Sequence, residues 1–191
     1  MHRRALILAC GSLLVRPAEA QAKQCLSVSM PDQLDVDGKQ LLLNGLGLRE
    51  ATVLAIDVYV AGLYLEQRST SPKQIIEAES TKLMKLVLLR DVSHRDLAEQ
   101  LGSHFRHAAG SNYDKLKARF DRMAAWLPTL REGDTFSVTY RAASGLDVRH
   151  GKKTLGTIPG ADYGRAIFSI WLGDKPPNEG LKRGLLGGRC G

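Results

Sequence analysis

The sequence predicts an α+β fold, in which helices pack on one side of a curved antiparallel sheet. Segments of alternating polar and apolar residues, rich in β-branched and aromatic side chains, indicate strands near both ends of the chain. Stretches with apolar residues three and four positions apart indicate helices between and after them. The strands are grouped with strands, which is typical of an α+β arrangement. The 191 residues suffice for one domain with a hydrophobic core.

The first half of the chain predicts a hairpin followed by a long strand. Residues 26–43 alternate around Asp37-Gly38, a turn between two short strands. Residues 52–66 are apolar and rich in valine, isoleucine and tyrosine, which favours a strand. Between these segments, Gly45 and Gly47 predict a corner where the first apolar run ends.

Arg49 is the first candidate functional residue. It lies between two apolar runs that we expect to be largely buried. A guanidinium there needs acceptors or a wet cavity, because burial of an unpaired charge is unfavourable.

The second half predicts two helices in a hairpin, a β-meander and a C-terminal helix. Serines with capping-box spacing open the helices of the pair, and Gly110 and Pro128 end them. The predicted elements, in chain order, are a short helix from Ser71-Pro72, a strand over 82–89, helices over 93–109 and 111–127, a meander over 134–158, a helix over 161–172 and a short helix near 181–186.

The N-terminus resembles a secretory signal peptide. Arg3 and Arg4 precede a short apolar run, and small residues follow it. The pattern predicts a signal peptide over residues 1–22, cleaved after Ala20 or Ala22, and a domain over residues 23–191; a buried N-terminal helix is the alternative. Export from a bacterial-type cell would place the protein in the periplasm. No other apolar run is long enough to span a bilayer, so we expect no integral membrane segment after cleavage.

Cleavage would leave two cysteines, Cys25 and Cys190, near the two ends of the mature chain. Chain termini often lie close together, and disulfides persist in an oxidising compartment. We therefore predict one disulfide between them, with two free thiols as the alternative.

The charge pattern and motifs exclude several classes of function. The net charge is +7, but lysines and arginines are scattered rather than clustered with aromatic residues, which argues against nucleic-acid binding. The chain lacks a nucleotide-binding or nucleophile-elbow motif, and we expect no cofactor. His104 and His107 have the spacing of a metal pair, but no third ligand completes it; we expect no metal site and solvent-facing histidines.

Tyr113 and Lys117 lie four positions apart at the start of a predicted helix. This spacing places them on one helix face, where they either form a solvated first turn or lean together over a cleft.

Four segments together resemble the bacterial, secreted branch of the chalcone isomerase-like family. The resemblance covers about residues 32–187, and its motifs are LNGLGLR (43–49), VYVAGLYLE (58–66), LLRDVS (88–93) and the stretch from GTIPGADYGRAIF to KRGLLG (156–187). It implies an open-faced β-sandwich of chalcone isomerase type, a large curved antiparallel sheet backed by helices, with a cleft between them.

The resemblance also implies roles for particular residues. In the plant enzymes, which cyclise a chalcone to a flavanone, an arginine that corresponds to Arg49 polarises the substrate. Tyr59 replaces a threonine of those enzymes, and the nearest counterparts of their tyrosine and lysine are Tyr113 with Lys115 or Lys117. Other members bind fatty acids without catalysis, with the arginine and a tyrosine on the carboxylate.

Three functions follow as expectations. The first is a non-catalytic binder of a small apolar ligand with an acidic or carbonyl head, similar to a fatty acid or a flavonoid, held by Arg49, Tyr59, Tyr113 and Lys117. The second is an intramolecular lyase acting on a chalcone-like enone, with Arg49 stabilising the enolate. The third is a structural or partner-binding module, in which Arg49 is a paired core charge. An open cleft beside Arg49 would favour the first two.

Overall fold

A computed structural model describes residues 21–51 and 56–190 of the chain. The predicted signal peptide lies almost entirely outside the described residues and stays a prediction. No helix in the described ranges is long and apolar enough to cross a membrane.

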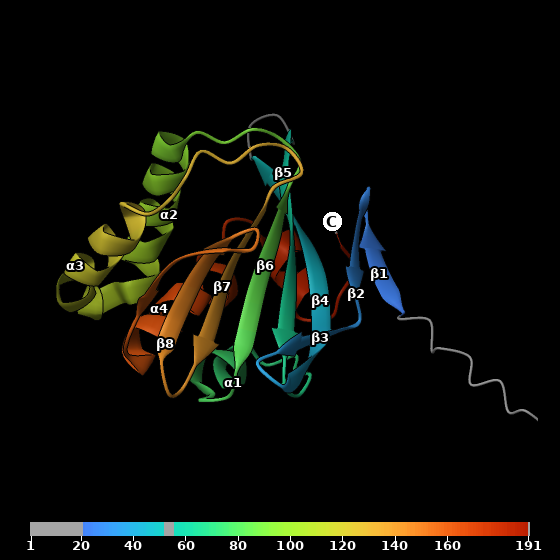
Figure 1. Cartoon of the computed structure of the whole chain (residues 1–191), viewed down its shortest axis with the longest axis horizontal. Helices are drawn as coiled ribbons and strands as arrows, with labels where there is room; N and C mark the ends of the chain where they lie inside the picture. The colour runs from blue at the N-terminus through green and yellow to red at the C-terminus, as the bar shows by residue number, and fades with distance from the viewer. Residues whose placement is uncertain (1–20, 52–55, 191) are drawn as a thin grey trace, which may run out of the picture.

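A seven-stranded antiparallel sheet forms the centre of the fold, and each of its strands lies beside its neighbour in sequence (Figure 1). The strands are β3 (Gln33–Val36), β4 (Lys39–Ala51), β5 (Ile56–Leu65), β6 (Lys82–Leu88), β7 (Thr135–Arg141), β8 (Gly145–His150) and β9 (Lys153–Ile158). The sheet confirms the predicted α+β fold with a large antiparallel sheet.

The helices lie against one face of this sheet (Figure 1). They are α1 (Pro72–Glu77), α2 (His94–Ala109), α3 (Tyr113–Ala124), α4 (Ala161–Leu172) and α5 (Glu179–Leu185). A short 3₁₀ turn, Gly110–Asn112, joins α2 to α3. These bounds agree with the helices predicted from apolar spacing.

The hydrophobic core lies between the helices and the sheet. Because side chains alternate along a strand, Phe136, Val138 and Tyr140 of β7 share one face, and each is about 2 % exposed. Ile170 and Trp171 of α4 belong to the same buried cluster. The alternation in the sequence therefore identifies the face of β7 that the helices cover.

The other face of β4 and β5 is covered by a two-stranded hairpin, β1 (Ala22–Cys25) and β2 (Val28–Pro31). A disulfide joins Cys25 of this hairpin to Cys190 beyond α5, with 5.8 Å between the Cα atoms. It confirms the predicted pairing. In the chain-entropy model, a loop this long contributes about 4–5 kcal/mol to stability.

The expected corner at Gly45 and Gly47 is wrong, because β4 runs through both residues with a bulge beside Gly45. The glycines allow α5 to lie directly on the strand. A Cβ at Gly45 would overlap the carbonyl oxygen of Gly184, and one at Gly47 would overlap that of Leu181. Only residues without a side chain permit this approach of two backbones.

Substitution of Gly47 by alanine should therefore destabilise the protein by about 2–3 kcal/mol, a typical cost of overpacking a filled site. Urea unfolding measures the change. The matched control is Gly102→Ala in α2, where the new Cβ would meet its nearest atom, on Phe120, at 3.4 Å. This control should be neutral or gain up to about 1 kcal/mol from helix propensity. Equal unfolding midpoints for the two variants would contradict the role given to Gly47.

Candidate functional site

A small cavity lies between the helix-covered face of the sheet and helices α2 and α4. Its volume is about 50 Å³. We call it the Arg49 cavity; its walls are formed by Arg49, Tyr59, Leu86, Leu97, Gln100, Leu101, His104, Phe136, Ile170, Trp171 and Pro177.

Pairing of β4 with β5 brings two of the predicted site residues together. Arg49 is directly opposite Tyr59 in the antiparallel register, so both side chains emerge on the same face, at the cavity. Arg49 is half-buried, and its Nη1 donates a hydrogen bond to the backbone oxygen of Glu50. Within residues 21–51 and 56–190, no carboxylate forms an ion pair with it. The guanidinium thus reaches an apolar cavity without an acidic partner.

Tyr59 is a hydrogen-bond donor whose hydroxyl is held in place by α4. Burial raises the pKa of Tyr59 to about 12, although the Trp171 hydrogen bond and the charge of Arg49 both act to lower it. The phenol therefore stays protonated at neutral pH. The indole Nε1 of Trp171 donates to the Tyr59 oxygen over 3.1 Å. Because the oxygen already accepts this bond, its own hydrogen is left to donate to another acceptor, such as one in the cavity.

His104 contributes a neutral imidazole to the same cavity. Burial, followed by the nearby charges of Arg49 and His107, holds the pKa of His104 below its usual value. The expectation of two solvent-facing histidines is therefore wrong for His104, which is half-buried, whereas His107 is exposed. Within the ranges that the structure describes, no group of three His, Cys, Asp or Glu side chains gathers to hold a metal ion.

Sequence reasoning missed His104 and Gln100 as cavity residues. His104 follows Leu101 by three positions and Leu97 by seven, so helical spacing places it beside the apolar stripe of α2. That spacing was the available signal. It could not reveal that the cation facing this stripe is Arg49, which lies about fifty residues earlier in the chain.

Tyr113 and Lys117 do not line the Arg49 cavity. The Tyr113 hydroxyl accepts a hydrogen bond from Nη2 of Arg106 over 3.1 Å. Lys117 forms an exposed i,i+4 ion pair with Asp121 at 2.5 Å. The structure therefore brings Arg49 and Tyr59 together, but not these two residues with them.

The first half of α2 covers the cavity and is less buried than the second half of that helix. In α2 the buried residues are Phe105 and Ala109, both in its second half, whereas Leu97 and Leu101 over the cavity are half-buried. Sites for drug-sized ligands usually have volumes of about 300–1,000 Å³. The cavity is several times smaller than such a site.

A model of the chalcone isomerase-like family matches residues 22–187. The chain belongs to the chalcone isomerase-like family. This confirms the family that the sequence motifs indicate, and the match includes every described strand and helix.

Among solved structures, this chalcone isomerase-like protein is similar to a fatty-acid binding protein of Arabidopsis thaliana, AtFAP1. The TM-score is 0.68 at 17 % sequence identity, and the similarity covers 87 % of this chain and 96 % of that one. At this identity the likeness shows a shared fold. No curated protein matches the chain by sequence.

Proposed function

We propose that this chalcone isomerase-like protein is a non-catalytic binder of a small apolar molecule with a carboxylate or carbonyl head. One observation carries the proposal: a half-buried guanidinium, that of Arg49, faces a cavity and has no acidic partner in the described chain. An unpaired buried charge is unfavourable, and an anionic ligand would remove that penalty.

The donors beside the cavity suit one oxyanion. Arg49 offers N–H groups that Glu50 does not use, and Tyr59 offers the hydrogen that Trp171 leaves free. Two donors from neighbouring strands can therefore hold the two oxygens of a carboxylate in charge-assisted hydrogen bonds. Apart from Gln100 and His104, the rest of the wall is apolar, which suits a hydrocarbon chain. The similar Arabidopsis protein, named for fatty-acid binding, is consistent with this class of ligand.

The proposal is tested by calorimetric titration of the mature protein with decanoic acid. Arg49→Gln should weaken binding by at least tenfold, because a hydrogen bond to a charged group contributes about 1.5–3 kcal/mol. Arg106→Gln is the control, since it removes a guanidinium from α2 that contacts Tyr113 rather than the cavity. Equal affinity in the two variants would contradict the proposal. Absence of binding by the wild type would favour a structural or partner-binding module.

The lowered pKa of His104 gives a second test. A carboxylate beside Arg49 offsets the charge that helps to depress the pKa of His104, so binding should raise that pKa toward its ordinary value of about 6.5. Binding near pH 6 should then take up protons, and affinity should rise as the pH falls from about 7.5 to 5.5. Calorimetry in two buffers of different ionisation enthalpy measures the uptake. It should vanish in His104→Gln, and proton release by the wild type would contradict the placement of the head group.

The runner-up is an intramolecular lyase acting on a chalcone-like enone. It is favoured by the same donor pair, which would stabilise an enolate, and by the neutral imidazole of His104, which can take a proton. The loss of chalcone absorbance, corrected for the spontaneous reaction, separates the two functions. The binder predicts no rate above background, whereas an acceleration that Arg49→Gln abolishes would establish the lyase.

We further propose export to the periplasm as a member of the bacterial, secreted branch, with cleavage after Ala20. A disulfide that ties both ends of the domain suits an oxidising compartment. The backbone oxygen of Gln21 accepts a hydrogen bond from Asp32 over 2.7 Å, and Ala22 is paired in β1. Cleavage after Ala20 keeps both contacts, whereas cleavage after Ala22 removes them. N-terminal sequencing of the exported protein should begin at Gln21; a start at Lys23 would contradict this site.

A further inference from the structure

A second hollow lies on the other face of the sheet, away from the helices. Its volume is about 390 Å³, and it lies between the β3–β4 hairpin and strands β6 to β8. We call it the outer groove; its walls are formed by Leu34, Asp35, Val36, Asp37, Leu83, Lys85, Thr135, Ser137, Thr139, Arg141, Arg149, Gly151 and Lys152.

The register of three strands places a hydroxyl between two cations on the floor of this groove. Lys85 of β6 is directly opposite Ser137 of β7, and Ser137 is directly opposite Arg149 of β8. Neighbouring strands are about 4.8 Å apart, and directly paired residues point to the same side of the sheet. An ammonium, a hydroxyl and a guanidinium thus form one row across the strands.

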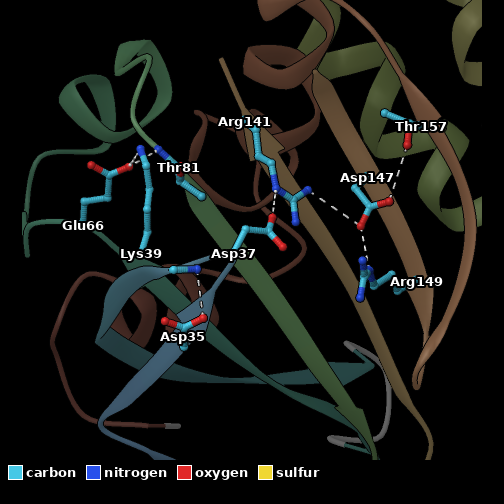
Figure 2. A network of polar contacts seen from close by, with 10 residues as sticks. Asp35, Asp37, Lys39, Glu66, Thr81, Arg141, Asp147, Arg149 and Thr157 are labelled. Carbon is cyan, nitrogen blue, oxygen red and sulfur yellow. Dashed lines mark hydrogen bonds and ion pairs between the residues drawn. The ribbon is translucent and has the colours of Figure 1, made fainter. Parts of the chain in front are cut away.

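A buried carboxylate orients the arginines of the groove. Asp147, about 5 % exposed, accepts from Nε of Arg149 at 2.7 Å and lies 3.8 Å from Nη1 of Arg141. Figure 2 shows Asp147 between these arginines, with Thr157 on its other oxygen. Because Asp147 takes the Nε of Arg149, the terminal N–H groups of that guanidinium are left for an acceptor in the groove.

The hairpin that forms the far wall is fixed across the sheet. Nε of Arg141 donates to Asp37 in the β3–β4 turn at 2.6 Å, as Figure 2 shows. The turn is closed by a hydrogen bond of 3.0 Å from the backbone nitrogen of Gly38 to Asp35. The wall is therefore held in place without a ligand, which lowers the entropy that binding would cost.

Two cations of the groove lack partners. Lys85, which is half-buried, and Lys152 form no ion pair within the described ranges, although Asp35 and Asp37 lie in the same walls. Of the four cationic side chains that line the groove, Arg141 is paired with Asp37 and Asp147, and Arg149 is paired with Asp147, so Lys85 and Lys152 carry the unpaired charges. The partly desolvated ammonium of Lys85 lies in the same row as the terminal N–H groups of Arg149. Together they favour an anion with several oxygens.

We propose that the outer groove binds a small phosphate ester, with its phosphate on the row Lys85–Ser137–Arg149. The three side chains can donate to three oxygens of one tetrahedral group, and the two unpaired cations of the groove, Lys85 and Lys152, match a doubly charged anion. The groove is larger than a bare phosphate and lies in the size range of small-molecule sites. Its further polar lining, including Thr135 and Asp35, suits a hydroxyl-bearing body on the ester.

The test follows backbone amide signals of the mature, disulfide-bonded protein by NMR during titration with glycerol phosphate and with inorganic phosphate. Shifts should cluster in β6, β7 and β8 on either side of Lys85, Ser137 and Arg149, and the ester should bind more tightly than inorganic phosphate. Lys85→Gln and Arg149→Gln should each weaken binding at least tenfold. Lys115→Gln, which removes an exposed lysine of α3, should not change it.

Four results would overturn the proposal: no shifts, shifts scattered over the surface, equal affinity in Lys85→Gln and Lys115→Gln, or a response to anionic lipid vesicles without any to the soluble phosphates. Lys85→Arg keeps the charge and should retain binding, which separates a loss of charge from a loss of structure. Because the sheet lies between the two sites, Arg49→Gln should leave phosphate binding unchanged. The failure of one proposal is therefore distinguishable from the failure of the other.

Discussion

The contact of α5 with the backbone of β4 fixes the position of the Arg49 cavity. Gly184 of α5 lies against Gly45 and Gly47, where a side chain on any of the three would overlap a backbone atom of the other element. The loop that joins α4 to α5 therefore passes beside Arg49. There Pro177 closes the cavity, and the Asn178 side chain donates to the Leu48 oxygen over 3.1 Å. The arginine is held by backbone contacts rather than by a carboxylate.

The same sheet presents two different surfaces because its side chains alternate. On the helix side, Arg49 and Tyr59 meet an apolar layer, and their hydrogen-bond donors face a small enclosed volume. On the outer side, Lys85 and Arg149 face an open, hydroxyl-lined groove. One surface suits a ligand that carries a hydrocarbon chain, and the other suits one that is polar throughout. The two proposed sites therefore differ in chemistry as well as in place.

The sequence predicts what local patterns determine. Apolar spacing placed helix 161–172, alternation placed the inner face of β7, and flanking apolar runs identified Arg49 as a cation in need of a partner. Contacts between residues that are distant in the chain could not be predicted from these local patterns. The glycines of β4 suggested a corner, whereas they make room for α5. That helix lies some 140 residues later in the chain, as the hydrogen bond from the Asn44 side chain to the Leu185 oxygen illustrates. Lys82, at the start of a strand, gave no sign that its ammonium is buried and donates to three carbonyl oxygens at the end of α1.

The central claim is that Arg49 holds an ionised head group inside the fold, and NMR of decanoic acid labelled with ¹³C at its carboxyl carbon tests it most directly. The bound carboxyl signal should titrate at a lower pH than that of the free acid, because a guanidinium and a phenol hydrogen stabilise the anion. In Arg49→Gln this depression should be lost. A bound carboxyl group that titrates at or above the pH of the free acid in the wild type would show a head group away from Arg49, and would contradict the account.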